Sequence, residues 1–298
     1  MMNLDGTHVA MVTPLNDDGT INEEEYRNLI DFLIDGGVEG ILAAGTTGES
    51  ATMTHDEHQK VIDIMVDQVN GRALTIAGAG SNATREAMDL VKYAEDAGAD
   101  TALVITPYYN KPQQSGLYDH FKILNDSNNI PIIAYNVPSR TGIDLSKDSI
   151  IDIAKLDNIV AIKEANPDLN KLASVFNDLE KNDLLDNFTV LSGNDSLTLP
   201  MIAQGSRGVI SVAANVLPDK MSAMVRKALE GKYDEARKLS NELFDIMDVM
   251  FIEASPAPAK RALNLMGKNV GGLRMPLKQM SDENDVVLQE VMKRYDLI

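Results

Sequence analysis

A lysine ends one of the most apolar stretches of the chain, which is an unusual place for a charged side chain. Residues 158–165 read N-I-V-A-I-K-E-A, and turn residues stand on both sides of them. Such a short, β-branched run predicts a strand that is covered on both faces. Because side chains alternate along a strand, Lys163 shares a face with Ala161 and lies opposite to Ile162. The sequence therefore predicts a buried lysine at a strand end.

A buried lysine has two possible uses. Taking an ammonium group out of water is costly unless the group is paired or loses its proton. A lysine that is neutral near pH 7 is a nucleophile towards carbonyl compounds and forms Schiff bases. The alternative is a structural ion pair, for which Glu164 is the adjacent carboxylate. Residues 158–165 alone leave both interpretations open.

The composition narrows the classes of function. The chain has 298 residues, 44% of them hydrophobic, which suits one large domain or a large domain with an appendage. A net charge of −18 argues against nucleic acid and anionic membranes as partners. The absence of cysteine excludes thiol catalysis and disulfides. We find no signal-peptide pattern and no membrane-spanning run, so a cytoplasmic protein is expected.

Short apolar runs alternate with segments of helical spacing. Each strand followed by a helix predicts parallel strands with right-handed crossovers. We predict a (β/α)8 TIM barrel over residues 1–230 and a C-terminal helical domain over residues 231–298. A doubly wound open sheet is the alternative, but its Gly-rich first turn is missing. The predicted strands are residues 8–13, 40–44, 74–79, 101–106, 130–135, 159–163, 188–192 and 208–212.

The helices of the barrel are predicted from apolar periodicity and from capping residues. Gly36 and Gly37 end the helix that begins with three glutamates, and Thr54 with Glu57 forms a capping box for a helix through Val69. The other predicted helices are residues 84–96, 115–125, 146–154, 169–179, 196–204 and 218–229.

Reactive side chains gather at the carboxyl ends of the predicted strands, where barrels of this kind have their active sites. Tyr135 ends the fifth strand and Lys163 ends the sixth, and neighbouring strands lie about 4.8 Å apart. A phenol beside the amine suits proton transfer during Schiff-base formation. The alternative for Tyr135 is a core tyrosine with a satisfied hydroxyl group.

Two further segments suit carboxylate binding. Thr46 and Thr47 lie between glycines in G-T-T-G, a turn that exposes backbone N–H groups and two hydroxyls. Arg140 lies in a Pro-bounded loop after Tyr135, and its planar fork matches a carboxylate. A plain tight turn and an ordinary loop salt bridge are the respective alternatives.

In this order and spacing, G-T-T-G-E, Y-N-V-P-S-R-T-G and I-K-E-A resemble the dihydrodipicolinate synthase family. This family belongs to the pyruvate-dependent Schiff-base aldolases and lyases, which include N-acetylneuraminate lyase. The resemblance runs from Gly6 to the C-terminal helices. It implies a lyase that condenses pyruvate with L-aspartate 4-semialdehyde to 4-hydroxy-tetrahydrodipicolinate, in the diaminopimelate route to L-lysine.

Two other functions compete with this one. A lyase for N-acetylneuraminate or for a 2-keto-3-deoxy sugar acid would use the same lysine, but Arg140 within S-R-T-G favours the synthase. A catalytically inactive barrel serving as a binding protein is disfavoured because Lys163, Tyr135 and Thr47 are all present.

The resemblance also implies roles for single residues. Lys163 resembles the Schiff-base lysine, Tyr135 the proton carrier, and Thr46 the residue that binds the pyruvate carboxylate. Arg140 resembles the residue that receives the semialdehyde carboxylate. The remaining members are the relay partners Thr47 and Tyr109, the latter from a neighbouring subunit, and the lining residues Gly193 and Ile210.

Other implications concern cofactors, assembly and regulation. No metal or organic cofactor is implied, because the iminium is the electron sink, and His55 and His58 do not form a zinc motif. Asn194 departs from members with Asp there, without touching a proposed step. We expect a homo-oligomer, most simply a tetramer. The positions that match a lysine-inhibitor site are Ser50, Ala51, His55, His58, Asn82, Glu86 and Tyr108. The alternative is that the histidines are solvated first-turn residues and Glu86 a helix-dipole charge.

Overall fold

The computed structural model describes residues 2–298. Eight strands close into a barrel in chain order, from β1 to β8. The neighbouring strands are parallel, which confirms the predicted (β/α)8 barrel. The strands are β1 (Gly6–Ala10), β2 (Gly40–Ala43), β3 (Leu74–Gly78), β4 (Thr101–Ile105), β5 (Ile132–Asn136), β6 (Ile159–Glu164), β7 (Thr189–Ser192) and β8 (Gly208–Ser211).

Helices follow the strands as predicted, and the sequence signals of their ends are visible. Thr54 caps α2 with a capping box in which the Glu57 side chain accepts from the Thr54 N–H. The helices are α1 (Glu23–Asp35), α2 (His55–Val69), α3 (Thr84–Asp96), α4 (Gln114–Ser127), α5 (Pro138–Thr141), α6 (Lys147–Ala154), α7 (Leu169–Lys181), α8 (Thr198–Gln204), α9 (Pro218–Leu229), α10 (Tyr233–Val249), α11 (Ala257–Leu265) and α12 (Asp282–Arg294), with 3-10 turns η1 (Ser50–Thr52), η2 (Asp195–Leu197) and η3 (Ala213–Asn215).

Some boundaries differ from the prediction for clear reasons. The first strand ends at Ala10, because the Val12 N–H donates to the Asn215 side chain, at 3.1 Å. Strand β5 begins after Pro131, which has no N–H to donate. The segment with Arg140 is a short helix, α5, rather than a loop. A proline at its first position favours helix entry, and Gly142, with φ of 73°, ends it.

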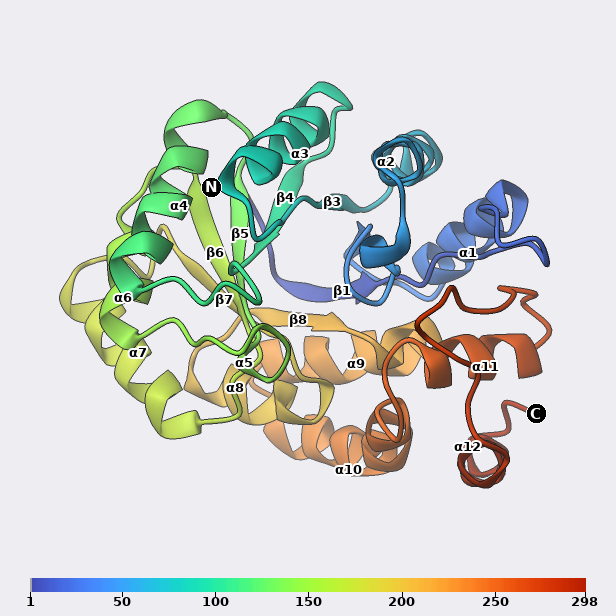
Figure 1. Ribbon diagram of the computed structural model, residues 1–298. Coiled ribbons are helices and arrows are strands. Elements are labelled where there is room, and N and C mark those ends of the chain that lie inside the picture. Colours follow the sequence, from blue (N-terminus) through green and yellow to red (C-terminus); the bar gives the residue numbers. More distant parts are fainter. Residues whose placement is uncertain (1) are drawn as a thin grey trace. The chain divides into compact units, whose positions relative to one another are not determined.

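The chain divides into two compact units. The first contains Ile76–Ile210 and the segment up to Gly6, and the second contains Thr7–Thr75 and Ser211–Ile298. In the first unit, α3, α4, α6 and α7 lie side by side outside strands β4 to β7 (Figure 1). In the second unit, α1 packs on α2, and α10 packs on both α9 and α12. The proposed domain boundary at residue 230 stays a prediction. Within residues 2–298, no helix is long and apolar enough to cross a bilayer.

The pairing of β5 with β6 determines which side chains face each other. Ile132 pairs with Ile159, but Ile133 pairs with Ala161, so β6 contains one extra residue at a bulge. Beyond this bulge, Tyr135 pairs with Lys163 and Asn136 with Glu164. A slip of one residue would place Ile162 opposite Tyr135 and turn Lys163 to the other face.

Candidate active site

Lys163 and Tyr135 form a buried pair at the ends of two neighbouring strands. The Nζ of Lys163 lies 4.3 Å from the centre of the Tyr135 ring. The side chains are only 5% and 7% exposed, respectively. The structure thus brings together the two residues whose types first suggested Schiff-base chemistry.

The ion pair considered as an alternative for Lys163 does not form. Glu164 follows Lys163 on the strand, points to the opposite side, and bonds to Asn136 and Lys171. Burial lowers the pKa of Lys163 to about 7, while the charge of Asp195 opposes this shift and that of Arg140 adds to it. A large share of the amine is therefore neutral near pH 7, as a nucleophile requires.

The phenol beside it stays protonated. Burial raises the pKa of Tyr135 to about 12; the charge of Arg140 opposes this shift, and that of Glu164 adds to it. A phenol with this pKa is not ionised at neutral pH, so it transfers protons along a hydrogen bond without a populated phenolate. Tyr135 thus suits proton relay at neutral pH.

Asp195 is a carboxylate whose charge acts on Lys163, and it was not among the predicted site residues. It is buried in η2, and its carboxylate favours the charged form of Lys163. The signal in the sequence was the S-G-N-D segment after the seventh strand. Within that segment, the Gly193 N–H donates to the Glu164 carbonyl at 2.7 Å, and a Cβ on Gly193 would lie 2.8 Å from the Ala165 Cβ. Only a glycine fits this approach.

Of the other predicted lining residues, Ile210 is buried in β8. Asn194 caps η2, its side chain accepting from the Ser196 N–H. Arg140 lies exposed on α5. The substrate contacts of Ile210 and Arg140 stay predictions.

Thr46 and Thr47 lie in the second unit, in the turn after β2, with Thr47 buried and Thr46 exposed. The Gly48 carbonyl accepts from the Thr13 hydroxyl at 2.7 Å. Glu49, the next residue, adopts a left-handed conformation with φ of 60°. A non-glycine residue in this region is uncommon and needs strong tertiary contacts.

Those contacts come from the C-terminal region and were not foreseen. Glu49 forms an ion pair with Lys260 of α11 at 2.7 Å, and both side chains are only 2% exposed. The Arg274 N–H donates to the second Glu49 oxygen at 3.1 Å, and the Arg274 guanidinium binds Glu57. This guanidinium holds the pKa of Glu57 at about 2. The threonine turn is thus anchored to α11 and the segment after it.

The two tyrosines after β4 are exposed. Tyr109 is 88% exposed and has a φ of 72°, while Tyr108 is less exposed. This exposure leaves the Tyr109 side chain accessible to a neighbouring subunit, as its predicted role requires. The structure holds one chain, so this role stays a prediction.

The positions suggested for lysine binding fall in both units. In the first, the Asn82 carbonyl accepts from Asn110 at 2.9 Å, and Glu86 accepts from the Ser81 hydroxyl. In the second, Ser50 and Ala51 lie in η1, and His55 begins α2. His58 is buried, so it is not a solvated first-turn residue.

A (β/α)8 barrel with such a buried lysine has the architecture of enzymes that form Schiff bases with carbonyl substrates. The chain belongs to the Dihydrodipicolinate synthetase family, which it matches over residues 3–295. It is 75% identical over 297 residues to the 4-hydroxy-tetrahydrodipicolinate synthase of Methanosphaera stadtmanae, with 100% of both chains covered. The predicted activity, 4-hydroxy-tetrahydrodipicolinate synthase in lysine biosynthesis, is confirmed by this similarity.

Solved structures of dihydrodipicolinate synthases have the same fold as this chain. The chloride-inhibited dihydrodipicolinate synthase of Acinetobacter baumannii complexed with pyruvate is 38% identical, with a TM-score of 0.96 over 99% of this chain and 100% of the other. The enzyme of Cyanidioschyzon merolae with lysine bound is 34% identical, with a TM-score of 0.94 over 99% of each chain.

Proposed function

We propose that Lys163 forms a Schiff base with pyruvate and that the derived enamine attacks L-aspartate 4-semialdehyde. The amine adds to the ketone carbon of pyruvate, and water leaves. The iminium loses a methyl proton to give the enamine, whose carbon bonds to the aldehyde carbon. The amino group of the second substrate then displaces Lys163 as the ring closes. The observation that carries this proposal is the buried Lys163, whose pKa is lowered to about 7, beside Tyr135.

We assign the other residues the roles that the family resemblance implies. Tyr135 carries the protons that these steps need, and Thr47 with Tyr109 connects it to solvent. Thr46 binds the pyruvate carboxylate through the G-T-T-G turn, and Arg140 receives the carboxylate of the semialdehyde as a bidentate partner. Gly193 and Ile210 line the site. The pyruvate complex of the Acinetobacter baumannii enzyme supports pyruvate as the first substrate.

Reductive trapping tests the first step. Pyruvate with cyanoborohydride is expected to attach one pyruvate-derived group to Lys163, and the trapping rate should rise with pH through about 7, because the neutral amine is the nucleophile. Mass spectrometry of digested protein gives the site. The Lys163→Met variant is the control and should stay unlabelled. Labelling of another lysine would contradict the proposed mechanism.

We also propose that the enzyme is a homo-oligomer, most simply a tetramer, in which Tyr109 of one subunit serves the site of another. A Tyr109→Phe protein and a Lys163→Met protein are each expected to be nearly inactive. Refolded together, they should regain activity, because a mixed oligomer combines an intact Lys163 with an intact Tyr109. Light scattering of the wild type gives the oligomer size. A fully active monomer, or mixed oligomers without activity, would refute the shared site.

Feedback inhibition by L-lysine is the third proposal, supported by the lysine-bound structure of the Cyanidioschyzon merolae enzyme. Glu86 supplies a carboxylate for an ammonium group, and Asn82 a donor and an acceptor. Initial rates should fall at millimolar lysine, and Glu86→Ala should weaken inhibition about tenfold or more, since a hydrogen bond to a charged group is typically worth about 1.5–3 kcal/mol.

Asp89→Ala is the matched control for this prediction, because Asp89 is an exposed carboxylate one turn further along α3. Its sensitivity to lysine should equal that of the wild type. Wild-type rates that do not change with lysine would refute the proposal.

A further inference from the structure

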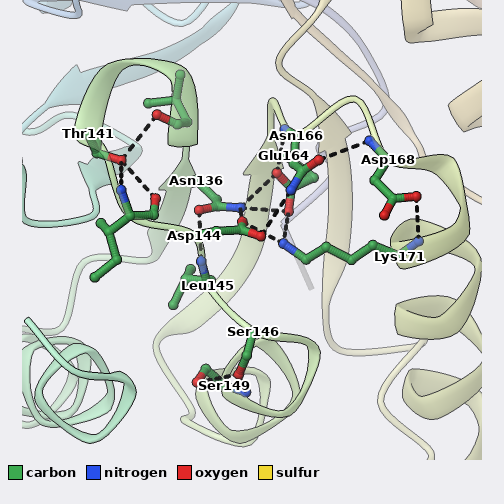
Figure 2. A network of polar contacts seen from close by, with 12 residues as sticks. Asn136, Thr141, Asp144, Leu145, Ser146, Ser149, Glu164, Asn166, Asp168 and Lys171 are labelled. Atoms are coloured by element: carbon green, nitrogen blue, oxygen red, sulfur yellow. Dashed lines mark hydrogen bonds and ion pairs between the residues drawn. The ribbon is translucent and has the colours of Figure 1, made fainter. Parts of the chain in front are cut away.

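A buried network of polar side chains lies directly behind the lysine–tyrosine pair. Asn136 follows Tyr135 on β5, and Glu164 follows Lys163 on β6, so both point to the opposite side of the strands from the pair. The Asn136 amide donates to the two carboxylate oxygens of Glu164, at 2.9 and 3.0 Å. Figure 2 shows these side chains facing each other.

Three more residues complete this network. Asp144, which follows α5, accepts from Asn136 and from the Lys171 ammonium, both at 2.7 Å. The Asn166 backbone N–H donates to Glu164 at 2.7 Å, and its side chain donates to Asp144 at 3.0 Å. Lys171, in the first turn of α7, also lies 3.5 Å from Glu164. One ammonium group therefore lies within ion-pair distance of two carboxylates at the point where β5, β6, α7 and the segment after α5 meet (Figure 2).

Burying the charged groups of this network has a high desolvation cost for a purely structural contact. The Glu164 side chain is 6% exposed, and burial raises its pKa, although Lys171, Asn166 and Asn136 oppose that shift. Apolar side chains of similar volume would fill such a place without this desolvation cost. Apolar contacts would not fix the position of one strand along the other, because apolar surfaces still pack after a small shift. Hydrogen bonds require a defined distance and angle, so they are lost on such a shift.

A contact that fixes the strand register is needed here because a bulge precedes the Tyr135–Lys163 pair. The register of β6 against β5 changes by one residue between Ile132 and Ile133, so the strand ends need a contact that specifies the shifted pairing. The Asn136–Glu164 bonds are made one residue beyond the Tyr135–Lys163 pairing.

The same network holds the segment that carries Arg140. The Leu145 N–H donates to the Asn136 side-chain oxygen at 3.1 Å, so Asn136 binds this segment through both ends of its amide. Within the segment, the Thr141 hydroxyl donates to the Val137 carbonyl at 3.1 Å and to the Ile143 carbonyl at 2.9 Å (Figure 2).

We propose that Asn136, Asp144, Glu164, Asn166 and Lys171 form a positioning network for the reaction, which fixes the register in which Lys163 faces Tyr135 and anchors the segment of Arg140. The inference rests on the proposed roles of Lys163, Tyr135 and Arg140. The five residues act through these groups and are positioning residues rather than catalytic ones.

Glu164→Gln is the sharpest test, because it keeps the size of the side chain. A glutamine has one acceptor oxygen where Glu164 has two, and its NH2 group takes the place of the other oxygen. This NH2 group would face the Asn136 amide group together with either Lys171 or the Asn166 N–H, so a donor meets a donor in both orientations. We expect kcat to fall about 10- to 100-fold, as is typical when reacting groups are misplaced by about 1 Å. The KM for pyruvate should stay within about threefold, because the carboxylate-binding turn is unchanged.

Asn136→Ala should reduce kcat by a similar factor. The kcat of the Asn136→Ala, Glu164→Gln double variant should lie within about threefold of the lower of the two single-variant values. Both changes break the same Asn136–Glu164 contact, so their effects should not multiply. Fully multiplicative effects would mean that the two residues act separately, against the network.

Lys147→Met is the matched control. It removes an ion pair between α6 and α7, Lys147–Asp178, which has no bond to either strand. Its kcat should change less than about twofold. The melting temperature of each variant shows whether it is folded at the assay temperature. If a strand variant does not fold, Lys171→Arg takes its place, because it keeps the positive charge but changes the position of the donor groups.

The outcomes separate this inference from the proposed function. Wild-type trapping of pyruvate at Lys163, together with network variants that match Lys147→Met in kcat, would overturn the network and leave the mechanism standing. A wild type that is not trapped at Lys163 would overturn the mechanism, and the inference with it.

Discussion

Replacing Lys163 by methionine is expected to reduce turnover roughly a thousandfold or more, since no other group takes over the nucleophile's role. Methionine is similar in length and apolar, so the barrel should remain packed around it. Steady-state turnover with pyruvate and L-aspartate 4-semialdehyde measures the effect. Lys155→Met, which removes an exposed lysine paired with Asp152 at the end of α6, should have wild-type activity. A Lys163→Met protein that keeps a tenth of wild-type turnover would exclude the Schiff base.

The same variant should be more stable than the wild type at neutral pH. Burial lowers the pKa of Lys163 from 10.5 to about 7, so the unfolded chain holds a proton that the folded chain releases between these values. The cost to folding is fully present below about pH 7 and is relieved as the pH rises towards 10.5. The gain in melting temperature should therefore be largest near or below pH 7 and shrink at higher pH. A lower melting temperature for Lys163→Met at pH 7 would contradict this account.

Lys260→Met is expected to cost about 3–5 kcal/mol of unfolding free energy, because it leaves a buried carboxylate without its counter-charge. The Glu49 carboxylate would keep its hydrogen bond from the Arg274 N–H, and Glu49 would still hold a left-handed conformation next to the threonine turn. We expect the loss in chemical denaturation and a higher KM for pyruvate, since the turn would no longer be held in place.

Two comparisons make this prediction specific. Lys227→Met breaks a surface pair with Glu235, at 3.0 Å, and should cost less than about 1 kcal/mol. Adding Glu49→Gln to Lys260→Met should recover part of the stability, because no buried charge is then left unpaired. If Lys260→Met is no less stable than Lys227→Met, the buried pair does not hold the turn.

The sequence by itself determined the elements and their order. Each strand of the barrel is a short apolar run between turn residues, and each helix has a periodic face or a cap such as Thr54 with Glu57. These signals are local, so they survive without knowledge of the fold. The burial of Lys163 was predictable for the same reason, because the apolar residues that bury it are its neighbours in the sequence.

Only the tertiary structure decided which side chains meet. The bulge in β6 sets Lys163 opposite Tyr135, yet no residue type in I-V-A-I-K marks an extra residue. The partner of Lys260, Glu49, lies 211 positions away in the sequence. Glu164 was considered only as an ion-pair partner of Lys163, and Asn136 was not singled out, although the two side chains bond across strands. Polar pairs of this kind leave no periodic pattern in the sequence, because their partners are chosen by strand register and by the packing of distant segments, and both of these exist only once the chain has folded.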